Sequence, residues 1–320
     1  MSNKALASPR SRLLVFSLAA MLAGVACPLS DAQTVMTTVG VGMSPIAVAV
    51  NPVTNKIYVA NQGSGNVTVI DGRTNTTSVV TAGSGAFALV VNALTNKVYV
   101  TNIGSGNVTV IDGATNTTTS VTVGTSPVAV AVNPVTNKIY VANIKSGSVT
   151  VIDGGTNTTS TITAGTSPVA VAINPMTNKI YVANNGSRNV TVIDGTTNTT
   201  STATAGTSPV AVAVNPMTNK IYVANQVTRN VTVIDGTTNT TKAVTAGTSP
   251  VALAVNPVTN KIYVANGEGS GNVTVIDGAS NTATPVTAGT SPVALAVNPM
   301  TNKIYVASID SGNVTVIDGQ

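Results

Sequence analysis

Several of the residue types that carry chemistry are scarce in this chain. Its 320 residues include no His, no Trp and a single Cys, and its aromatic residues are two Phe and seven Tyr. Charged residues make up 8% of the chain, compared with roughly 25% in an average globular protein. Because His is the commonest general base and metal ligand, its absence argues against acid–base enzymes and copper sites, and the lack of Trp excludes Trp-derived quinone cofactors. No bound cofactor is expected.

The chain begins with a segment of a different kind. Three cationic residues, Lys4, Arg10 and Arg12, precede an apolar run at 13–26. A positive start, a short apolar stretch and small residues behind it are typical of a secretory signal peptide. The run is shorter than the ~20 residues that span a bilayer as a helix, so no retained anchor is expected. We therefore predict a signal peptide over 1–32 and an exported protein that is periplasmic, cell-surface or secreted.

The cleavage site decides whether the mature protein keeps its only cysteine. Cleavage is expected after Ala32, and Ala26 is the alternative. Cys27 leaves a lipoprotein interpretation open, although the Leu expected three residues before such a cysteine is replaced by Gly24. With cleavage after Ala32 the mature chain has no cysteine and does not rely on disulfides, even outside the cytoplasm.

Everything after this segment is a sevenfold repeat that can be counted on its tyrosines. They are spaced by 41 residues five times and then by 42. A period of about 40–45 residues with four strands is typical of a propeller blade. The seven positions are Tyr58, Tyr99, Tyr140, Tyr181, Tyr222, Tyr263 and Tyr305.

Each repeat contains four short segments of strand-forming residues separated by turn residues, and we name these strands A to D. No segment has helical periodicity, so the chain is predicted to be all-β. A Pro at the second position of "NPVTN" favours a tight A–B turn, and Asp-Gly favours a turn between C and D. In the third repeat the four predicted strands cover 128–133, 138–143, 148–153 and 160–165.

The phase of the repeat predicts a closed ring. Residues 34–42 align with strand D alone, whereas 313–320 align with strand C alone. The N-terminal strand is therefore expected to complete the last blade, which gives seven strands of each kind. An open solenoid would need polar capping repeats, and none is visible. We predict one domain over 33–320, a seven-bladed β-propeller with four antiparallel strands per blade.

Three motifs carry a resemblance to a known family. "YVTN" stands at 99–102, followed by "VTVIDGATNTT" at 108–118 and "SPVAVAVNP" at 126–134. The chain resembles the YVTN-repeat β-propellers, which include exported surface-layer-type proteins of bacteria and archaea. The resemblance covers 34–320 in seven copies and implies the propeller fold, but it implies no activity because this fold supports many.

An aspartate recurs once per repeat in "IDG" and has two interpretations. Pairing strands B and C about a four-residue loop places Lys56 opposite Asp71 and Asn61 opposite Asn66. Lysine and aspartate would then face each other across every hairpin, which stabilises by about 0.2–1 kcal/mol. The alternative is a ring of carboxylates that binds metal, but a calcium site needs six to eight oxygens, so no metal is expected. The repeated "NVT" and "NTT" match glycosylation sequons and are interpreted as turn and strand residues.

The differences between repeats concentrate in the B–C loop. Once the recurring Lys and Asp are set aside, five of the seven remaining charges of the mature chain lie there. In a four-stranded blade the B–C and D–A connections emerge on one face of the disc, and loops on a rigid scaffold commonly carry function. We therefore predict a partner-binding face formed by these five residues, with solubility alone as the alternative. They are Lys145, Arg188, Arg229, Glu268 and Asp310.

These features favour an exported, non-enzymatic propeller that binds a protein or a cell-surface polymer, or that has a structural role at the envelope. A hydrolase or lyase would have to use Glu268 and Asp310, because no other carboxylate lacks a lysine across its hairpin. Nucleic-acid binding is not expected, since the loops have neither stacking aromatics nor clustered Arg and Lys. No catalytic residue is assigned, and a monomer is expected.

Overall fold

The computed structural model describes residues 37–319, and all regular structure in that range is β-strand. The expected signal peptide at 1–32 lies outside the described residues. Within the described part no helix is long and apolar enough to cross a bilayer.

The strands of the first four sheets are β1 (Pro45–Asn51), β2 (Lys56–Asn61), β3 (Asn66–Asp71) and β4 (Thr77–Thr81); β5 (Ala86–Asn92), β6 (Lys97–Asn102), β7 (Asn107–Asp112) and β8 (Thr118–Thr122); β9 (Pro127–Asn133), β10 (Lys138–Asn143), β11 (Ser148–Asp153) and β12 (Thr159–Thr163); β13 (Pro168–Asn174), β14 (Lys179–Asn184), β15 (Asn189–Asp194) and β16 (Thr200–Thr204). Those of the last three are β17 (Pro209–Asn215), β18 (Lys220–Asn225), β19 (Asn230–Asp235) and β20 (Thr241–Thr245); β21 (Pro250–Asn256), β22 (Lys261–Asn266), β23 (Asn272–Asp277) and β24 (Ala283–Thr287); β25 (Pro292–Asn298), β26 (Lys303–Ser308) and β27 (Asn313–Asp318).

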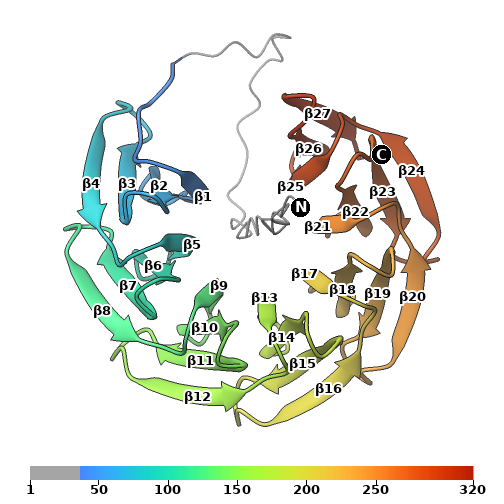
Figure 1. The fold of residues 1–320 in the computed structure, drawn as a ribbon, viewed down its shortest axis with the longest axis horizontal. Coiled ribbons are helices and arrows are strands. Elements are labelled where there is room, and N and C mark those ends of the chain that lie inside the picture. The colour runs from blue at the N-terminus through green and yellow to red at the C-terminus, as the bar shows by residue number, and fades with distance from the viewer. Residues whose placement is uncertain (1–36, 320) are drawn as a thin grey trace, which may run out of the picture.

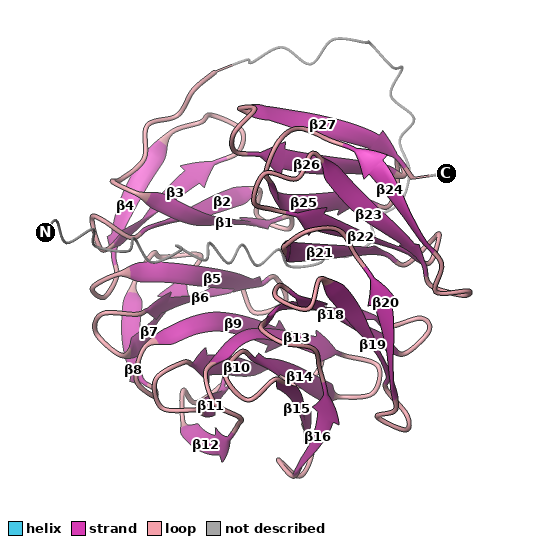
Figure 2. Ribbon diagram, turned by 45° about the vertical axis from the view of Figure 1, so that its right-hand side comes forward, coloured by secondary structure: helices cyan, strands magenta, loops and turns pink. Residues whose placement is uncertain are grey.

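Seven antiparallel sheets surround a common centre, so the chain is a seven-bladed β-propeller. In each sheet the strands follow one another in sequence order. Strand A of every blade lies innermost, and strand D lies outermost in the first six blades (Figure 1). The second view contains only strands and loops in the described part (Figure 2). The predicted fold class is confirmed.

The predicted strand bounds and register agree closely with the structure. In the first blade Lys56 pairs with Asp71 and Asn61 with Asn66, with the four residues between them also in the expected register. In the third blade strands B and C occupy the predicted ranges, while strand D ends at Thr163 instead of 165. It ends early because residues 164–165 already lead into the D–A loop.

The core lies between blades, where apolar side chains of one sheet meet those of the next. Val149 and Val151 of the third blade form one buried cluster with Ile180 and Val182 of the fourth. Tyr140 in the same cluster is fully buried. Both faces of each sheet therefore have to be apolar, which explains why strands B and C have nearly continuous runs of apolar residues.

The seventh sheet differs from the other six. It contains three strands, β25–β27, among the described residues. Residues 34–36 of the expected closing strand lie outside the described range, and 37–42 are not part of a strand. Val314 and Val316 of β27 are 60% and 51% exposed, whereas their equivalents in the other blades are buried, apart from the partly buried Val275 of the sixth blade. Closure of the ring by the N-terminal strand stays a prediction.

Candidate binding face

The B–C and D–A loops lie on one face of the disc, as the topology predicts, and we call it the B–C face. Each B–C loop is held by main-chain hydrogen bonds to the D–A loop that leads into its own blade. The amide of Gln62 donates to the carbonyl of Ser44 at 3.0 Å, and Ile144 repeats this bond to Ser126 at 3.0 Å. Backbone bonds of this kind leave the side chains of the loop free to vary.

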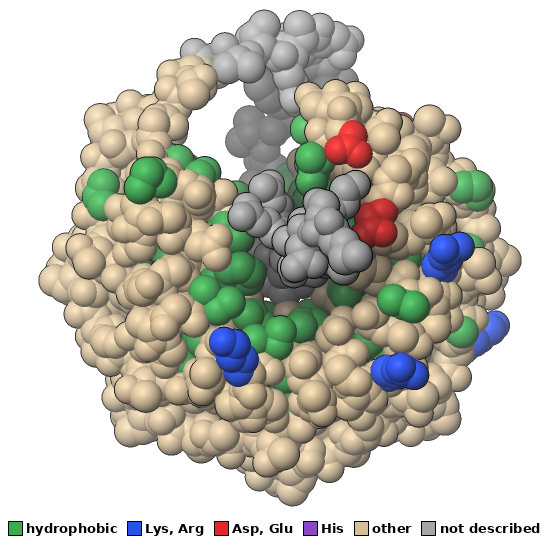
Figure 3. Space-filling view, viewed as in Figure 1, with side chains coloured by type: hydrophobic (Ala, Val, Ile, Leu, Met, Phe, Trp, Pro, Cys, Tyr) green, Lys and Arg blue, Asp and Glu red, His purple; other side chains and the backbone are tan. Residues whose placement is uncertain are grey.

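All five predicted binding residues lie exposed on this face. Lys and Arg side chains are spaced apart over one part of it, and the Asp and Glu side chains lie together over another part (Figure 3). Within residues 37–319 the Lys145 ammonium and the Arg188 and Arg229 guanidinium groups form no hydrogen bond or ion pair. The three cations are therefore available to a partner.

Two of these cations occupy a backbone position that suits glycine. The last residue of the four-residue B–C loop is left-handed, with φ of 61° at Gly65 and 59° at Gly147. Arg188 and Arg229 take the same position with φ of 57° and 56°. A left-handed conformation costs a non-glycine residue roughly 1–2 kcal/mol.

The third charged residue with positive φ is Glu268, at 41°, in a B–C loop that is one residue longer than the others. Every other described non-glycine residue with positive φ is Asn or Ser. Between residues 37 and 319, charged side chains thus have positive φ only in the B–C loops of three consecutive blades, the fourth to the sixth. Such local strain is concentrated at functional sites in proteins generally.

The two carboxylates predicted on this face belong to loops that are joined through one serine. The Ser291 hydroxyl donates a hydrogen bond to Asp310. The same hydroxyl oxygen accepts a bond from the amide of Gly269, next to Glu268, at 3.0 Å. The structure therefore brings these two loops together but uses Asp310 as a hydrogen-bond acceptor within the fold.

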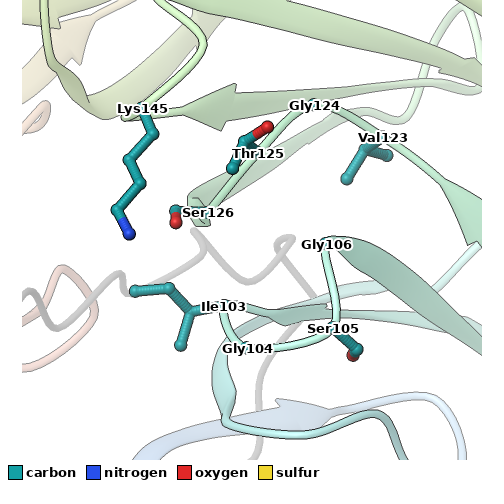
Figure 4. A pocket seen from close by; sticks show the side chains of 9 residues that line it. All are labelled: Ile103, Gly104, Ser105, Gly106, Val123, Gly124, Thr125, Ser126 and Lys145. Atoms are coloured by element: carbon teal, nitrogen blue, oxygen red, sulfur yellow. The ribbon is translucent and has the colours of Figure 1, made fainter.

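Lys145 borders a hollow of about 450 Å³ between the second and third blades. Figure 4 shows its side chain beside Ile103 and Ser126, with the B–C loop of the second blade opposite. The hollow has one cation and several hydroxyls but no aromatic side chain, which suits a hydrated, anionic group better than a planar one.

The recurring lysines do more than face the aspartates across their hairpins. The register is confirmed in every blade, but among residues 37–319 one direct ion pair is formed, Lys220 to Asp235 at 2.7 Å. In four blades the ammonium instead donates to the Gly carbonyl of the next blade, as from Lys56 to Gly113 at 2.6 Å. The lysine therefore links blades, which a hairpin register alone does not predict.

The recurring aspartates have a structural role in the C–D turn. The carboxylate of Asp112 accepts hydrogen bonds from the amides of Ala114 and Thr115 at 2.9 and 3.0 Å. These backbone bonds lower the pKa of Asp112, and Lys97 contributes less to the shift. No group of three or more potential ligands within residues 37–319 could hold a metal ion. The "NTT" asparagines are the left-handed residues of the same turns, in line with their interpretation as turn residues.

One feature was missed by the sequence interpretation. Each A–B turn carries an exposed apolar side chain between its proline or alanine and its threonine. The signal was present, because this position is Val, Leu or Met in all seven repeats. Whether this residue matters depends on how exposed its side chain is, and the exposure follows from the geometry of the folded turn.

Comparison with known proteins supports the fold alone. No protein-family model and no curated protein matches the chain. A structure of hydrazine synthase from Kuenenia stuttgartiensis is similar with a TM-score of 0.67 and 21% identity, covering 91% of this chain and 99% of that chain. A chain in a mitotic checkpoint complex has a TM-score of 0.70 and 16% identity, covering 93% of this chain and 98% of that one.

Proposed function

We propose that the protein is an exported, non-enzymatic propeller of the YVTN-repeat type that serves as a binding scaffold at the cell envelope. Its partner, a protein or a cell-surface polymer, contacts the B–C face. The observation that carries this proposal is the placement of Arg188 and Arg229 at a turn position where the same chain elsewhere uses glycine. Backbone strain of this kind lowers stability, so its presence in adjacent blades supports a functional role for these residues.

The remaining properties of the face fit an acidic partner. Lys145, Arg188 and Arg229 are exposed and unpaired within the described residues, so no internal ion pair has to be broken when a partner binds. Because the scaffold is built from paired strands, the charges are presented on a rigid surface, which lowers the entropic cost of binding. The carboxylates at the sixth and seventh blades would repel an acidic partner and so restrict how it lies on the face.

The chain itself provides the variant that tests this proposal. Lys145→Gly, Arg188→Gly and Arg229→Gly together restore the residues found at the same loop positions in the first blade. Arg73→Thr is the matched control, because it removes an exposed cation from the C–D loop and Thr occupies this position in the fourth blade. None of these changes removes a buried side chain, so all variants should fold.

Melting temperatures would be compared with and without a panel of divalent cations, acidic and neutral cell-wall polysaccharides, and short nucleic acids. A ligand that binds the folded state raises its stability. We expect an envelope polymer to raise the melting temperature of the wild type and of Arg73→Thr, but not of the triple glycine variant. A shift of equal size in all three proteins would place binding elsewhere. No shift with any member would contradict polymer binding and leave a protein partner or a structural role.

A further inference from the structure

The face opposite the B–C face carries a ring of exposed apolar side chains, one per blade, which we call the apolar ring. Each member stands at the tip of an A–B turn and is between 70% and 78% exposed. They are the seven most exposed large apolar residues of the range 37–319, followed by Met43 at 68%. The ring comprises Val53, Leu94, Val135, Met176, Met217, Val258 and Met300.

The ring is not a by-product of turn formation. The turn needs a residue of left-handed conformation, which Asn55 and its equivalents provide, and it favours Pro at its second position. Neither requirement concerns the tip residue, which could be polar at no cost to the fold. The tip nevertheless changes between Val, Leu and Met while staying apolar in every blade. Single exposed apolar residues scattered over a surface are normal, whereas a set of seven gathered on one face is typical of an interaction surface.

Hydrogen bonds hold the ring rigid. The side-chain oxygen of Asn133, the last residue of β9, accepts a bond from the amide of the tip residue Val135 at 3.0 Å. Its amide nitrogen donates to Asn178 in the next A–B turn at 2.8 Å. The first bond recurs in all seven blades, and the second joins six successive pairs of turns. A surface fixed in this way loses little conformational entropy on binding.

We propose that the apolar ring is the contact surface for a second copy of this chain, forming a face-to-face dimer. The seven tips repeat at the pitch of the blades, and a second copy presents the same pitch about its own axis. A twofold axis perpendicular to the channel therefore brings tips against tips, which is an isologous contact. At about 100 Å² of apolar surface per side chain, the ring offers on the order of 700 Å² per copy, close to the ~800 Å² that each partner contributes to a standard interface.

The charges around the ring also favour a second copy over a lipid surface. Every blade places one Lys and one Asp at this end of its B–C hairpin, and the C–D loop of the first blade adds Arg73, so the face has both signs in nearly equal number. Two such faces do not repel each other, whereas binding to anionic lipid needs an excess of cations. The tips also lack the Trp and Tyr that anchor proteins at bilayer interfaces. The dimer proposed here differs from the monomer expected from the sequence.

Sedimentation velocity of the full chain from about 1 to 100 μM would test the proposal. The test variant is Met176→Thr/Met217→Thr/Met300→Thr, whose changed side chains lie in solvent. The matched control is Val79→Thr/Val227→Thr, which makes the same kind of change on strand D and in a B–C loop at side chains 66% and 62% exposed. Melting temperatures of all three proteins would confirm that they are folded.

We expect the wild type and the control to form dimers, and the test variant to dissociate at least tenfold more readily. A wild type that stays monomeric throughout, or a dimer that the test variant forms as readily, would overturn the proposal. A parallel flotation assay with phosphatidylcholine and phosphatidylglycerol vesicles tests the alternative that the ring binds a lipid surface. A monomeric wild type that floats with vesicles, when the test variant does not, would assign the ring to lipid instead. These outcomes do not depend on binding at the B–C face.

Discussion

The two faces of the disc are built from the same repeats but are held together in different ways. On the face opposite the B–C face, which we call the A–B face, the Asn at the end of strand A fixes its own turn and also the turn of the next blade. Asn133 does this for Val135 and Asn178. On the B–C face the loops are held mainly by main-chain bonds within one blade, such as Ile144 to Ser126. Three loops add a bond to the following blade that involves a side chain: Asn185 and Gln226 donate from their side chains, and the amide of Gly269 donates to the Ser291 hydroxyl.

This difference explains which residues vary along the chain. A side chain that serves two turns cannot change without disturbing both, so the A–B turns keep their Asn. They vary at the exposed tip and, in the second repeat alone, at the preceding position, where Ala93 replaces Pro. A loop held by its backbone accepts new side chains at little cost, and the unmatched charges accumulate there. The predictions below test this contrast, beginning with the interior that all blades share.

The largest expected effect is alkaline unfolding of the shared interior. Burial, with a smaller contribution from the aspartate of the next blade, raises the pKa of Tyr99, Tyr140, Tyr181 and Tyr222 to about 12. Since the folded pKa lies above the unfolded value of about 10, this stability is complete below pH 10 and is lost between pH 10 and 12. The loss approaches ~2 kcal/mol per tyrosine at pH 12. Tyrosinate absorbance and circular dichroism should therefore change together, and tyrosinate formation near pH 10 with the sheets intact would contradict the prediction.

The second effect compares an amide side chain on each face. The Asn133 side chain is fully buried. Asn133→Ala leaves the partly buried amide of Val135 and side-chain oxygen of Asn178 without partners, and we expect a loss of about 2–3 kcal/mol. Asn185→Ala removes bonds to Ser208 and Pro209 at a partly exposed loop, and the loss should stay under ~1 kcal/mol. Urea unfolding of both variants would measure the difference. Equal losses would remove the contrast between the faces.

The third effect concerns the seam between the last and first blades. Val151→Thr places a hydroxyl in the packed interface between the third and fourth blades and should cost about 1–2 kcal/mol. Val316 is its equivalent in β27. If the ring is closed as predicted, Val316→Thr should cost about as much, which denaturant unfolding of the full chain can establish. A cost near zero at Val316 would mean that the seam is open.

The smallest effect is a reciprocal exchange at one loop position. Arg188→Gly relieves a left-handed arginine and should stabilise the fold by up to ~1 kcal/mol, because greater freedom in the unfolded chain offsets part of the gain. Gly147→Arg should destabilise it by a similar amount. A Cβ at Gly147 would meet only the carbonyl of Gly165 at 3.5 Å, so the cost arises from the backbone. Thermal melting of the two variants should give shifts of opposite sign, and shifts of the same sign would contradict the strain argument.

Much of the fold could be predicted because the same four-strand pattern occurs seven times in the sequence. The tyrosine spacing predicts the blade, and pairing strands B and C about a four-residue loop predicts the register in which Lys56 meets Asp71. The choice of partner could not be predicted, since whether an ammonium binds its own hairpin or Gly113 of the next blade depends on the distance between sheets. The five binding residues were located on one face from topology, but their binding role stays a prediction.

Two further features depend on backbone conformation and so lay beyond the sequence pattern. The strain at Arg188 and Arg229 follows from φ at one loop position, and the sequence shows only that glycine stands there in other blades. The apolar ring follows from the exposure of residues such as Met176, whose neighbours in sequence are unremarkable strand and turn residues.

The central claim is that the B–C loops differ from one another because they serve binding, and that their individual sequences are not needed for the fold. Its most direct test is the free energy of unfolding of a variant in which every B–C loop carries the Gln62–Gly65 sequence of the first blade. The claim predicts a stability equal to or above that of the natural chain, because strained residues are replaced by glycine. A loss of more than ~2 kcal/mol, a large share of the stability of a typical domain, would show that the loops belong to the scaffold and would contradict the claim.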